Sequence, residues 1–281
     1  MALKSRAKSF NPRRQLEESF YRALLKLVRP YLSALDLDQL RLLPSNIEQI
    51  AHDPAFIKAS ESLARRMVTG IARENAASWR VAANSSMKGK KIYAALKEEL
   101  AGNTGLRVAD LVRENTVKIV TVTQDIAHRV TPLIAKLQQE GVRSFDIEPK
   151  IAGHLLYLAD WQVRRIARTQ VAMSETDLTR ARAERIGVKW YQWVTSHDGR
   201  VRDSHRVMDS VLCRWDDPPS PELLSGLPPN KRHPHYTCGQ VYNCRCVALP
   251  VVSLDEIAWP AKVHINGSIK RMTRAQFEKI Q

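Results

Sequence analysis

The chain has 281 residues, enough to bury one large core or two modest ones. It contains no apolar run long enough to span a membrane, and its basic first ten residues are not followed by the apolar core of a secretory signal. We therefore expect a protein that is made in the cytoplasm and does not contact a membrane.

The formal net charge is +15, from 44 Lys and Arg against 29 Asp and Glu. This excess favours a polyanionic partner, because contacts with phosphates release condensed counterions. Double-stranded DNA bound without sequence preference is the leading candidate. The charge gathers at the ends, so we expect residues 1–14, with Arg13 and Arg14, to form a basic arm and residues 253–281 to form a basic tail. A merely solvated basic surface is the alternative.

Residues 15–187 are predicted to form a helical domain. Asp53 followed by Pro54 is typical of a helix start. A second helix is expected through residues 108–137, with a kink before Pro132, because apolar residues recur there three, four or seven positions apart. The β-branched run from Ile119 to Thr123 would suit a strand, but the helical stripe passes through it. That stripe consists of Val108, Val112, Ile119, Val122, Ile126, Val130, Leu133 and Leu137.

A further helix is predicted from about Glu148 to Arg185, ending at Gly187. Arg164 and Arg168 lie one turn apart on one of its faces. They could hold phosphate or an acidic partner, or could form a solvated edge. The buried stripe is expected to comprise Ala152, Ala159, Val163, Ile166 and Met173.

Residues 188–252 are predicted to form a small, loop-rich α+β module. Lys189 to Thr195 alternates and is aromatic, as a strand should be. The segment "DDPPSPELLSGLPPNKRHPHYTCG" is too rich in proline for a regular helix or a central strand, so it needs another source of order. The predicted fold class is thus mainly α, an elongated helical region followed by this module, which zinc could order.

The stretch "HDGRVRDSH" (residues 197–205) is expected to be a hairpin-like reversal, because Asp198-Gly199 has turn chemistry. Arg200 and Arg202 would then share one face and Val201 the other. Asp203 or Ser204 could cap a short helix that carries His205, and a nearby carboxylate could orient that histidine as metal-bound histidines usually are. His197 fits an exposed loop.

The four cysteines, Cys213, Cys238, Cys244 and Cys246, all lie in the last third of the chain. In an extended segment Cys244 and Cys246 point to one face and Arg245 to the other. One Zn²⁺ could accept both thiolates, with Cys213, Cys238, His205 or His235 completing a tetrahedral set. Free buried thiols and disulfides are the alternatives. His233 belongs to the same dense segment.

Residues 160–250 resemble the phage Mu F-like head morphogenesis proteins, also described as minor capsid proteins. The resemblance lies in "RRIARTQVAMSETDLTRARAERIGVKWYQWVTSHDGRVRDSHRVMDS", "CRWDDPPS" and "NCRCVALP", which occur in the order and spacing of that family. Three departures are evident. Gln170 replaces the usual glutamate, Asp209-Ser210 replaces Asp-Gly, and Cys213 and Cys238 are additional. A zinc site on His205, Cys244 and Cys246 would therefore be general to the family.

The resemblance implies a low-copy, non-enzymatic component inside the phage head, near the portal vertex, that supports head assembly, genome stability and genome delivery. The implied partners are the portal protein, the major capsid or scaffold proteins and DNA. We expect Arg200, Arg202 and Arg245 to contact DNA or acidic surfaces. A metal-dependent hydrolase or nuclease using Asp198 and His205 is the alternative, although no phosphate loop or paired-Asp motif accompanies them.

Overall fold

The computed structural model describes residue 10 and residues 14–32, 38–39, 42–84, 86, 89–98 and 102–281. Most of the expected basic arm, including Arg13, lies outside the described residues. The chain divides into two compact units, and the division does not fall at residue 187 as expected. One unit contains residues 14–69 and 110–170, and the other contains Phe10 with residues 70–109 and 171–281.

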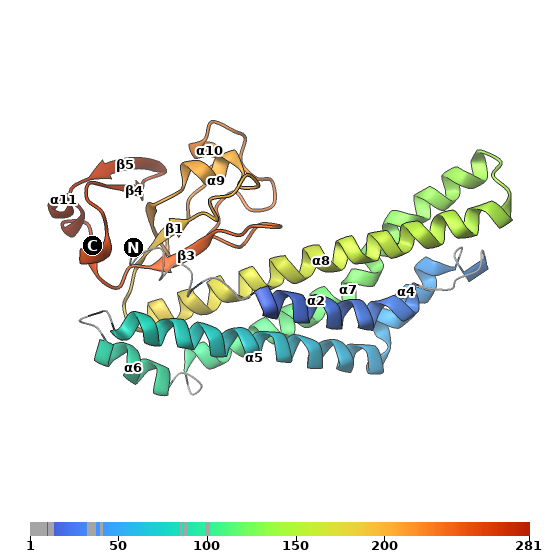
Figure 1. Ribbon diagram of the computed structural model, residues 1–281, viewed down its shortest axis with the longest axis horizontal. Helices are drawn as coiled ribbons and strands as arrows, with labels where there is room; N and C mark the ends of the chain where they lie inside the picture. The colour runs from blue at the N-terminus through green and yellow to red at the C-terminus, as the bar shows by residue number, and fades with distance from the viewer. Residues whose placement is uncertain are drawn as a thin grey trace. The chain divides into compact units, whose positions relative to one another are not determined.

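The described residues before residue 186 are mostly helical, as predicted (Figure 1). None of the described helices is long and apolar enough to cross a membrane. The helices are α2 (Arg14–Val28), a 3₁₀ turn η1 (Arg29–Tyr31), α4 (Leu43–His52), α5 (Pro54–Asn84), α6 (Gly89–Lys97), α7 (Asn103–Gln139) and α8 (Ser144–Arg185).

The start of α5 confirms the predicted cap, because Asp53 Oδ1 accepts the backbone N–H of Ala55 at 2.9 Å. Helix α7 runs without a break through Ile119–Thr123 and past Pro132, so the apolar stripe decides the structure there. Five stripe positions are fully buried, namely Val112, Ile119, Val122, Ile126 and Val130.

Helix α8 begins at Ser144, four residues before the predicted start at Glu148. The helix starts earlier because its buried stripe extends further towards the N-terminus than expected. Ile147 and Ile151, four positions apart, are the first residues of that stripe. Ala152 and Met173, which we placed in the stripe, are only partly buried. The buried series comprises Ile147, Ile151, Leu155, Ala159 and Val163. The helix ends as predicted, with Gly187 at a φ of 72°.

The C-terminal module is built on a five-stranded sheet of order β3-β1-β2-β4-β5, in which only β2 and β4 run parallel among the paired strands. The strands are β1 (Trp190–Val194), β2 (Val211–Arg214), β3 (Val247–Pro250), β4 (Ala261–Ile265) and β5 (Ser268–Met272). The short helices are α9 (Asp203–Val207), α10 (Pro221–Leu224), the 3₁₀ turn η3 (Leu254–Glu256) and α11 (Arg274–Glu278). Figure 1 shows α9 and α10 beside one another within this module.

The expected basic tail is instead part of the sheet. Residues 261–272 form the hairpin of β4 and β5, and Asn266 and Gly267 make its turn with φ values of 50° and 68°. Both residues therefore adopt the positive φ that a two-residue hairpin turn requires. Phe277 of α11 is fully buried, with its ring centroid 4.8 Å from that of Trp190. Tertiary packing and the Asn-Gly turn thus place this segment in the sheet, although its charge predicts a basic arm.

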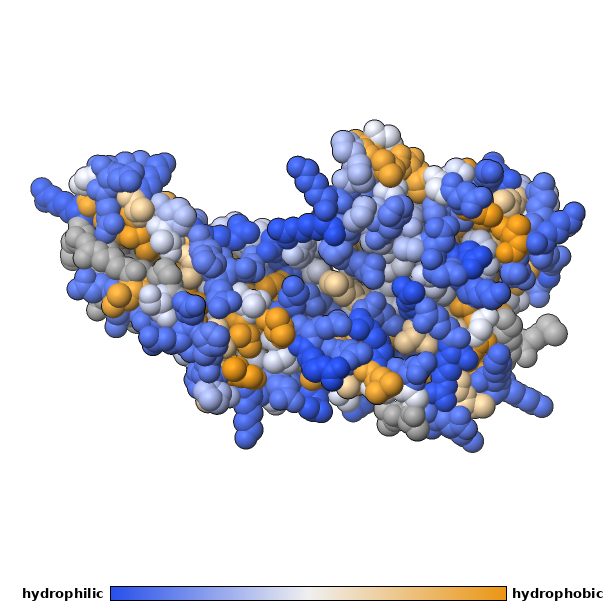
Figure 2. Space-filling view, turned by 180° about the vertical axis from the view of Figure 1, so that it is seen from behind, coloured by the Kyte–Doolittle hydropathy of each residue, from blue (hydrophilic) through white to orange (hydrophobic). Residues whose placement is uncertain are grey.

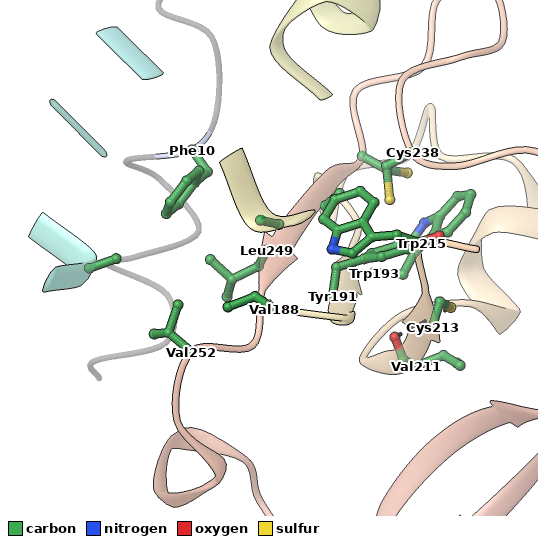
Figure 3. Close-up of a cluster of buried hydrophobic side chains, with 14 of the residues drawn as sticks. Phe10, Val188, Tyr191, Trp193, Val211, Cys213, Trp215, Cys238, Leu249 and Val252 are labelled. Carbon is green, nitrogen blue, oxygen red and sulfur yellow. Dashed lines mark hydrogen bonds between the residues drawn. The ribbon is translucent and has the colours of Figure 1, made fainter. Parts of the chain in front are cut away.

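Alternation along β1 sends its aromatic side chains to two cores. Tyr191 and Trp193 are completely buried, and Tyr191 stacks on Trp215 with ring centroids 4.3 Å apart. Figure 3 shows these rings beside Cys213 and Cys238. Trp190 belongs to the second core, with Leu212, Val263 and Phe277. The strand is therefore buried more completely than an alternating pattern predicts.

Candidate metal centre

Three side chains with metal-binding atoms converge inside the C-terminal module. The ligand atoms of His205, Cys244 and Cys246 all lie within 4.8 Å of one another, and all three residues are buried. His205 Nδ1 is 3.6 Å from Cys244 Sγ and 3.4 Å from Cys246 Sγ. Tetrahedral zinc with Zn–S and Zn–N bonds of usual length separates its nitrogen and sulfur ligands by about 3.5 Å. The spacing of the three residues therefore fits a zinc ion.

Two separate segments supply this group. Short helix α9 carries His205, and the extended segment before β3 carries Cys244 and Cys246 on one face with Arg245 on the other, as predicted. The expected cap of α9 is wrong. Its N-cap residue is Arg202, whose side chain makes no capping hydrogen bond. Asp203 lies inside the helix and pairs with Arg206.

The two thiols are not equivalent. The thiol of Cys246 hydrogen-bonds to Cys244 and lowers the pKa of Cys244 well below its usual range. The same hydrogen bond and burial raise the pKa of Cys246. Cys244 is thus the thiol that ionises first, and thiolates are the form that binds metal.

The other nitrogen of His205 faces a tyrosine rather than a carboxylate. His205 Nε2 lies 3.0 Å from the hydroxyl of Tyr236, and that hydroxyl donates to Glu222 Oε1 at 2.7 Å. The edge of the His205 ring also packs against Trp193, with centroids 5.4 Å apart. The sequence suggests a carboxylate that orients this histidine, and in the structure Glu222 takes that place, with Tyr236 between the two groups.

Cys213 and Cys238 are buried but do not belong to the group of three. Burial raises the pKa of both thiols, which favours the neutral form. His233 is exposed, and exposed His235 lies with its Nδ1 3.2 Å from the carbonyl of Pro218. The structure therefore narrows the candidate ligands to one histidine and two cysteines, and does not build a four-ligand set with either extra thiol.

The turn at Asp198 is tied to the segment that carries the cysteines. Asp198 Oδ1 accepts the backbone N–H of Arg200 at 2.9 Å, which confirms the turn, and Val201 is buried while Arg200 and Arg202 are exposed. Both carboxylate oxygens of Asp198 accept from the guanidinium of Arg245, one of them at 2.6 Å. This pairing lowers the pKa of Asp198.

A second tie joins the same two segments, because Arg202 Nη2 donates to the carbonyl of Tyr242 at 2.6 Å. In this structure Arg202 and Arg245 each bind within the chain, and their contact with a partner stays a prediction. Of the side chain of Arg200, 75% is exposed, against 25% for Arg245.

Residues 126–249 match the family described as Phage Mu protein F like protein. The chain carries a Mu F-like domain. This confirms the resemblance over residues 126–249. The matched residues include the whole His205, Cys244 and Cys246 group and the Asp198–Arg245 pair.

A protein of Haemophilus influenzae, described as uncharacterized, is 37% identical to the chain over 91 residues. The match covers 32% of this chain and 17% of that relative, so the chain spans only about a sixth of the relative's length. No solved structure matches.

Ser210 and Gly239 are two positions of the Mu F-like domain with a positive φ. Ser210 adopts a φ of 65°, so the turn keeps the positive φ for which glycine is usual, and Asp209 anchors it by accepting both the N–H and the hydroxyl of Thr195. Gly239 has a φ of 81° and packs so closely on α8 that an added Cβ would lie 2.9 Å from the carbonyl oxygen of Ala172. Its N–H donates to Cys244 Sγ at 3.4 Å. Cys238-Gly239 follows a long loop, a sequence signal for such a turn.

The arginine pair on α8 has acidic partners inside the chain. Arg168 Nε lies 3.1 Å from Glu17 and Arg164 Nη1 lies 3.8 Å from Glu18, both on α2. The guanidinium of Arg164 also covers the ring of Tyr21 at 3.9 Å. The pair thus binds acidic residues of helix α2, and its contact with phosphate or an acidic partner stays a prediction. Gln170 is buried on the same helix, and the effect of replacing the family's glutamate remains a prediction.

Proposed function

We propose that this protein is a minor head protein that lies inside the phage procapsid and capsid at the portal vertex. It would bind the portal protein, the major capsid or scaffold proteins and packaged DNA, and support assembly, genome stability and delivery. The observation that carries the proposal is the Mu F-like domain at residues 126–249. The net charge of +15 supports a polyanionic partner.

The C-terminal module acts in this proposal as a rigid interaction domain closed by zinc. His205 and the two thiolates of Cys244 and Cys246 would hold the ion, and zinc would supply structural cross-linking where the proline-rich segment has little regular structure. The strands and helix α9 provide the frame in which these three side chains meet.

DNA would be held by cations that the fold leaves accessible. Arg14 and Arg200 are exposed, as are Lys270 and Arg271 on β5, the last strand in the sheet order. Arg164, Arg168, Arg202 and Arg245 would contact DNA only by exchanging the partners they have within the chain. Figure 2 shows one face of the molecule on which hydrophilic residues dominate between small apolar patches.

A hydrolase built on Asp198 and His205 is the second candidate, and the geometry disfavours it. Asp198 forms an ion pair with Arg245, and the metal-binding group found among the described residues does not include Asp198. Incubation with plasmid DNA and Mg²⁺, Mn²⁺ or Zn²⁺ tests this candidate. We expect no cleavage by the wild type, whereas metal-dependent cleavage that His205→Ala abolishes would establish it.

Imaging of purified procapsids tests the proposed location. We expect density for this chain on the inner side of the portal vertex, in few copies per head. A chain that is absent from procapsids, or that coats their outer surface, would overturn the proposal.

A further inference from the structure

We propose that Tyr236 and Glu222 are positioning residues that fix the tautomer of His205 and so present its Nδ1 to the metal. The inference rests on the metal centre of the proposed function and extends it to two residues outside the ligand set. It also couples the proline-rich segment to the metal, because both residues lie in or directly after that segment.

The hydroxyl of Tyr236 has a single proton to donate. That hydroxyl donates to Glu222 Oε1 at 2.7 Å, so towards His205 it can only accept. His205 Nε2, at 3.0 Å, must then carry a proton and donate it. In a neutral imidazole the proton on Nε2 leaves a lone pair on Nδ1.

That lone pair is where a metal ligand is needed. Nδ1 lies 3.6 Å from Cys244 Sγ and 3.4 Å from Cys246 Sγ, whereas Nε2 faces the tyrosine. The opposite tautomer would direct an N–H at the sulfurs and leave the tyrosine hydroxyl without its donor. Metal-bound histidines are commonly oriented by a carboxylate behind the second nitrogen, and here a tyrosine lies between the two groups.

Burial strengthens the two hydrogen bonds that join Glu222, Tyr236 and His205, which we call the relay. Tyr236 is 1% exposed and His205 is 2% exposed, so water does not compete readily for either hydrogen bond. The ring of Tyr236 packs against Trp193, with centroids 6.1 Å apart, which limits its freedom to turn away. The hydroxyl is thus held where it can act on the histidine.

The relay also reaches the backbone of the proline-rich segment. Glu222 lies on α10, and the N–H of Tyr236 donates to the carbonyl of Pro219 at 3.0 Å, which joins the two ends of the segment. A metal held by His205 therefore restrains α10 through Tyr236. Loss of the metal should loosen residues 216–236 more than the strands.

The tautomer can be measured on the full chain by nitrogen-15 NMR of the histidine rings, with and without one equivalent of Zn²⁺. We expect the proton of His205 on Nε2 in both samples and the zinc-induced shift on Nδ1. A proton on Nδ1, or zinc on Nε2, would overturn the assignment. The measurement without zinc tests the relay even if the protein binds no zinc, an outcome that would count against the metal centre alone.

Competitive zinc titration of Tyr236→Phe provides the second test. The variant keeps the packed ring and removes only the hydroxyl, and we expect zinc affinity to fall about 10- to 100-fold. Tyr242→Phe is the matched control, because the Tyr242 hydroxyl lies on the surface, 3.3 Å from Arg232, and its loss should leave the affinity unchanged. Hydrogen exchange after chelation should rise in residues 216–236. Unchanged affinity in a folded Tyr236→Phe variant would contradict the relay.

Discussion

Arg245 lies between the two cysteines of the metal-binding group and binds both carboxylate oxygens of Asp198 on the opposite face of the segment. The same short segment is thus held from two sides, by the candidate metal on one face and by an ion pair on the other. Asp198 is 47 residues away in sequence, so the pair fixes the turn of residues 197–205 against the cysteines. The turn is thus tied to the segment that carries the cysteines.

The Asp198–Arg245 pair predicts a pH dependence. Arg245 depresses the pKa of Asp198 in the folded state, so the pair stabilises the fold above the ordinary aspartate pKa of 3.8 and loses that effect as the pH falls through the lower folded value. We expect Asp198→Asn to be less stable than the wild type at pH 6 and to approach it below pH 3. Urea unfolding of metal-free protein at several pH values measures this. A stability difference that is the same at both ends of the range would show that the carboxylate charge does not matter.

Gly239→Ala should destabilise the module by about 1–3 kcal/mol, because the new Cβ would meet the α8 backbone and the φ is positive. Gly199→Ala is the matched control. No atom lies within 4 Å of the Cβ it would add, so its free energy of unfolding should change by no more than about 0.5 kcal/mol. Urea unfolding compares the two variants. Equal free energies of unfolding for the two variants would contradict the close approach of Gly239 to the α8 backbone.

Glu175 on α8 predicts a second pH effect, of opposite sign. Burial raises its pKa from 4.5 to about 8, despite a 2.6 Å hydrogen bond from Asn75. Because the folded state holds the proton more tightly, stability should fall as the pH rises from about 4.5 to about 8. Glu175→Gln removes this penalty and should gain on the wild type over that range, on the order of several kcal/mol at the upper end.

The control for that prediction is Glu184→Gln on the same helix. Glu184 is exposed and pairs with Arg180, so its variant should show no such trend with pH. Thermal unfolding of the three proteins between pH 5 and pH 8 makes the comparison. A Glu175→Gln variant that runs parallel to the wild type throughout would refute the buried neutral carboxyl.

DNA binding should depend on Arg200 more than on an equally exposed arginine elsewhere. Removing one phosphate contact lowers the slope of log affinity against log salt by about one. We expect that change for Arg200→Ala and not for Arg22→Ala. Both side chains are 75% exposed, but Arg22 lies 3.0 Å from Glu18, whereas Arg200 lies at the longer distance of 3.7 Å from Asp198. Affinity titrations at several salt concentrations measure the slopes. Binding that ignores salt would argue against phosphate contacts altogether.

Local signals in the sequence predicted most of the fold. The apolar stripe through Ile119 and Ile126 identifies α7, and the alternation around Trp193 identifies β1. The C-terminal strands were not predicted, because a high content of Lys and Arg masks the Asn266-Gly267 turn between them. That turn is a local signal, whereas the parallel pairing of β4 with β2 depends on tertiary contacts.

The candidate site was predictable where neighbours in sequence set the geometry. Cys244 and Cys246 share a face because the side-chain period of an extended segment is two. Their histidine was identified through the family pattern as well as its setting. Tyr236 and Glu222 were missed because an irregular proline-rich segment carries no period from which its contacts could be inferred. Only the folded chain shows which tyrosine reaches His205.

The metal content of protein purified without added metal tests the account of the module most directly. We expect about one zinc per chain in the wild type and in Cys213→Ser, since Cys213 lies outside the ligand group, and almost none in Cys246→Ser. A wild type that carries no zinc after expression in zinc-replete medium, or a Cys246→Ser variant that keeps its full content, would contradict the metal centre on which the account depends.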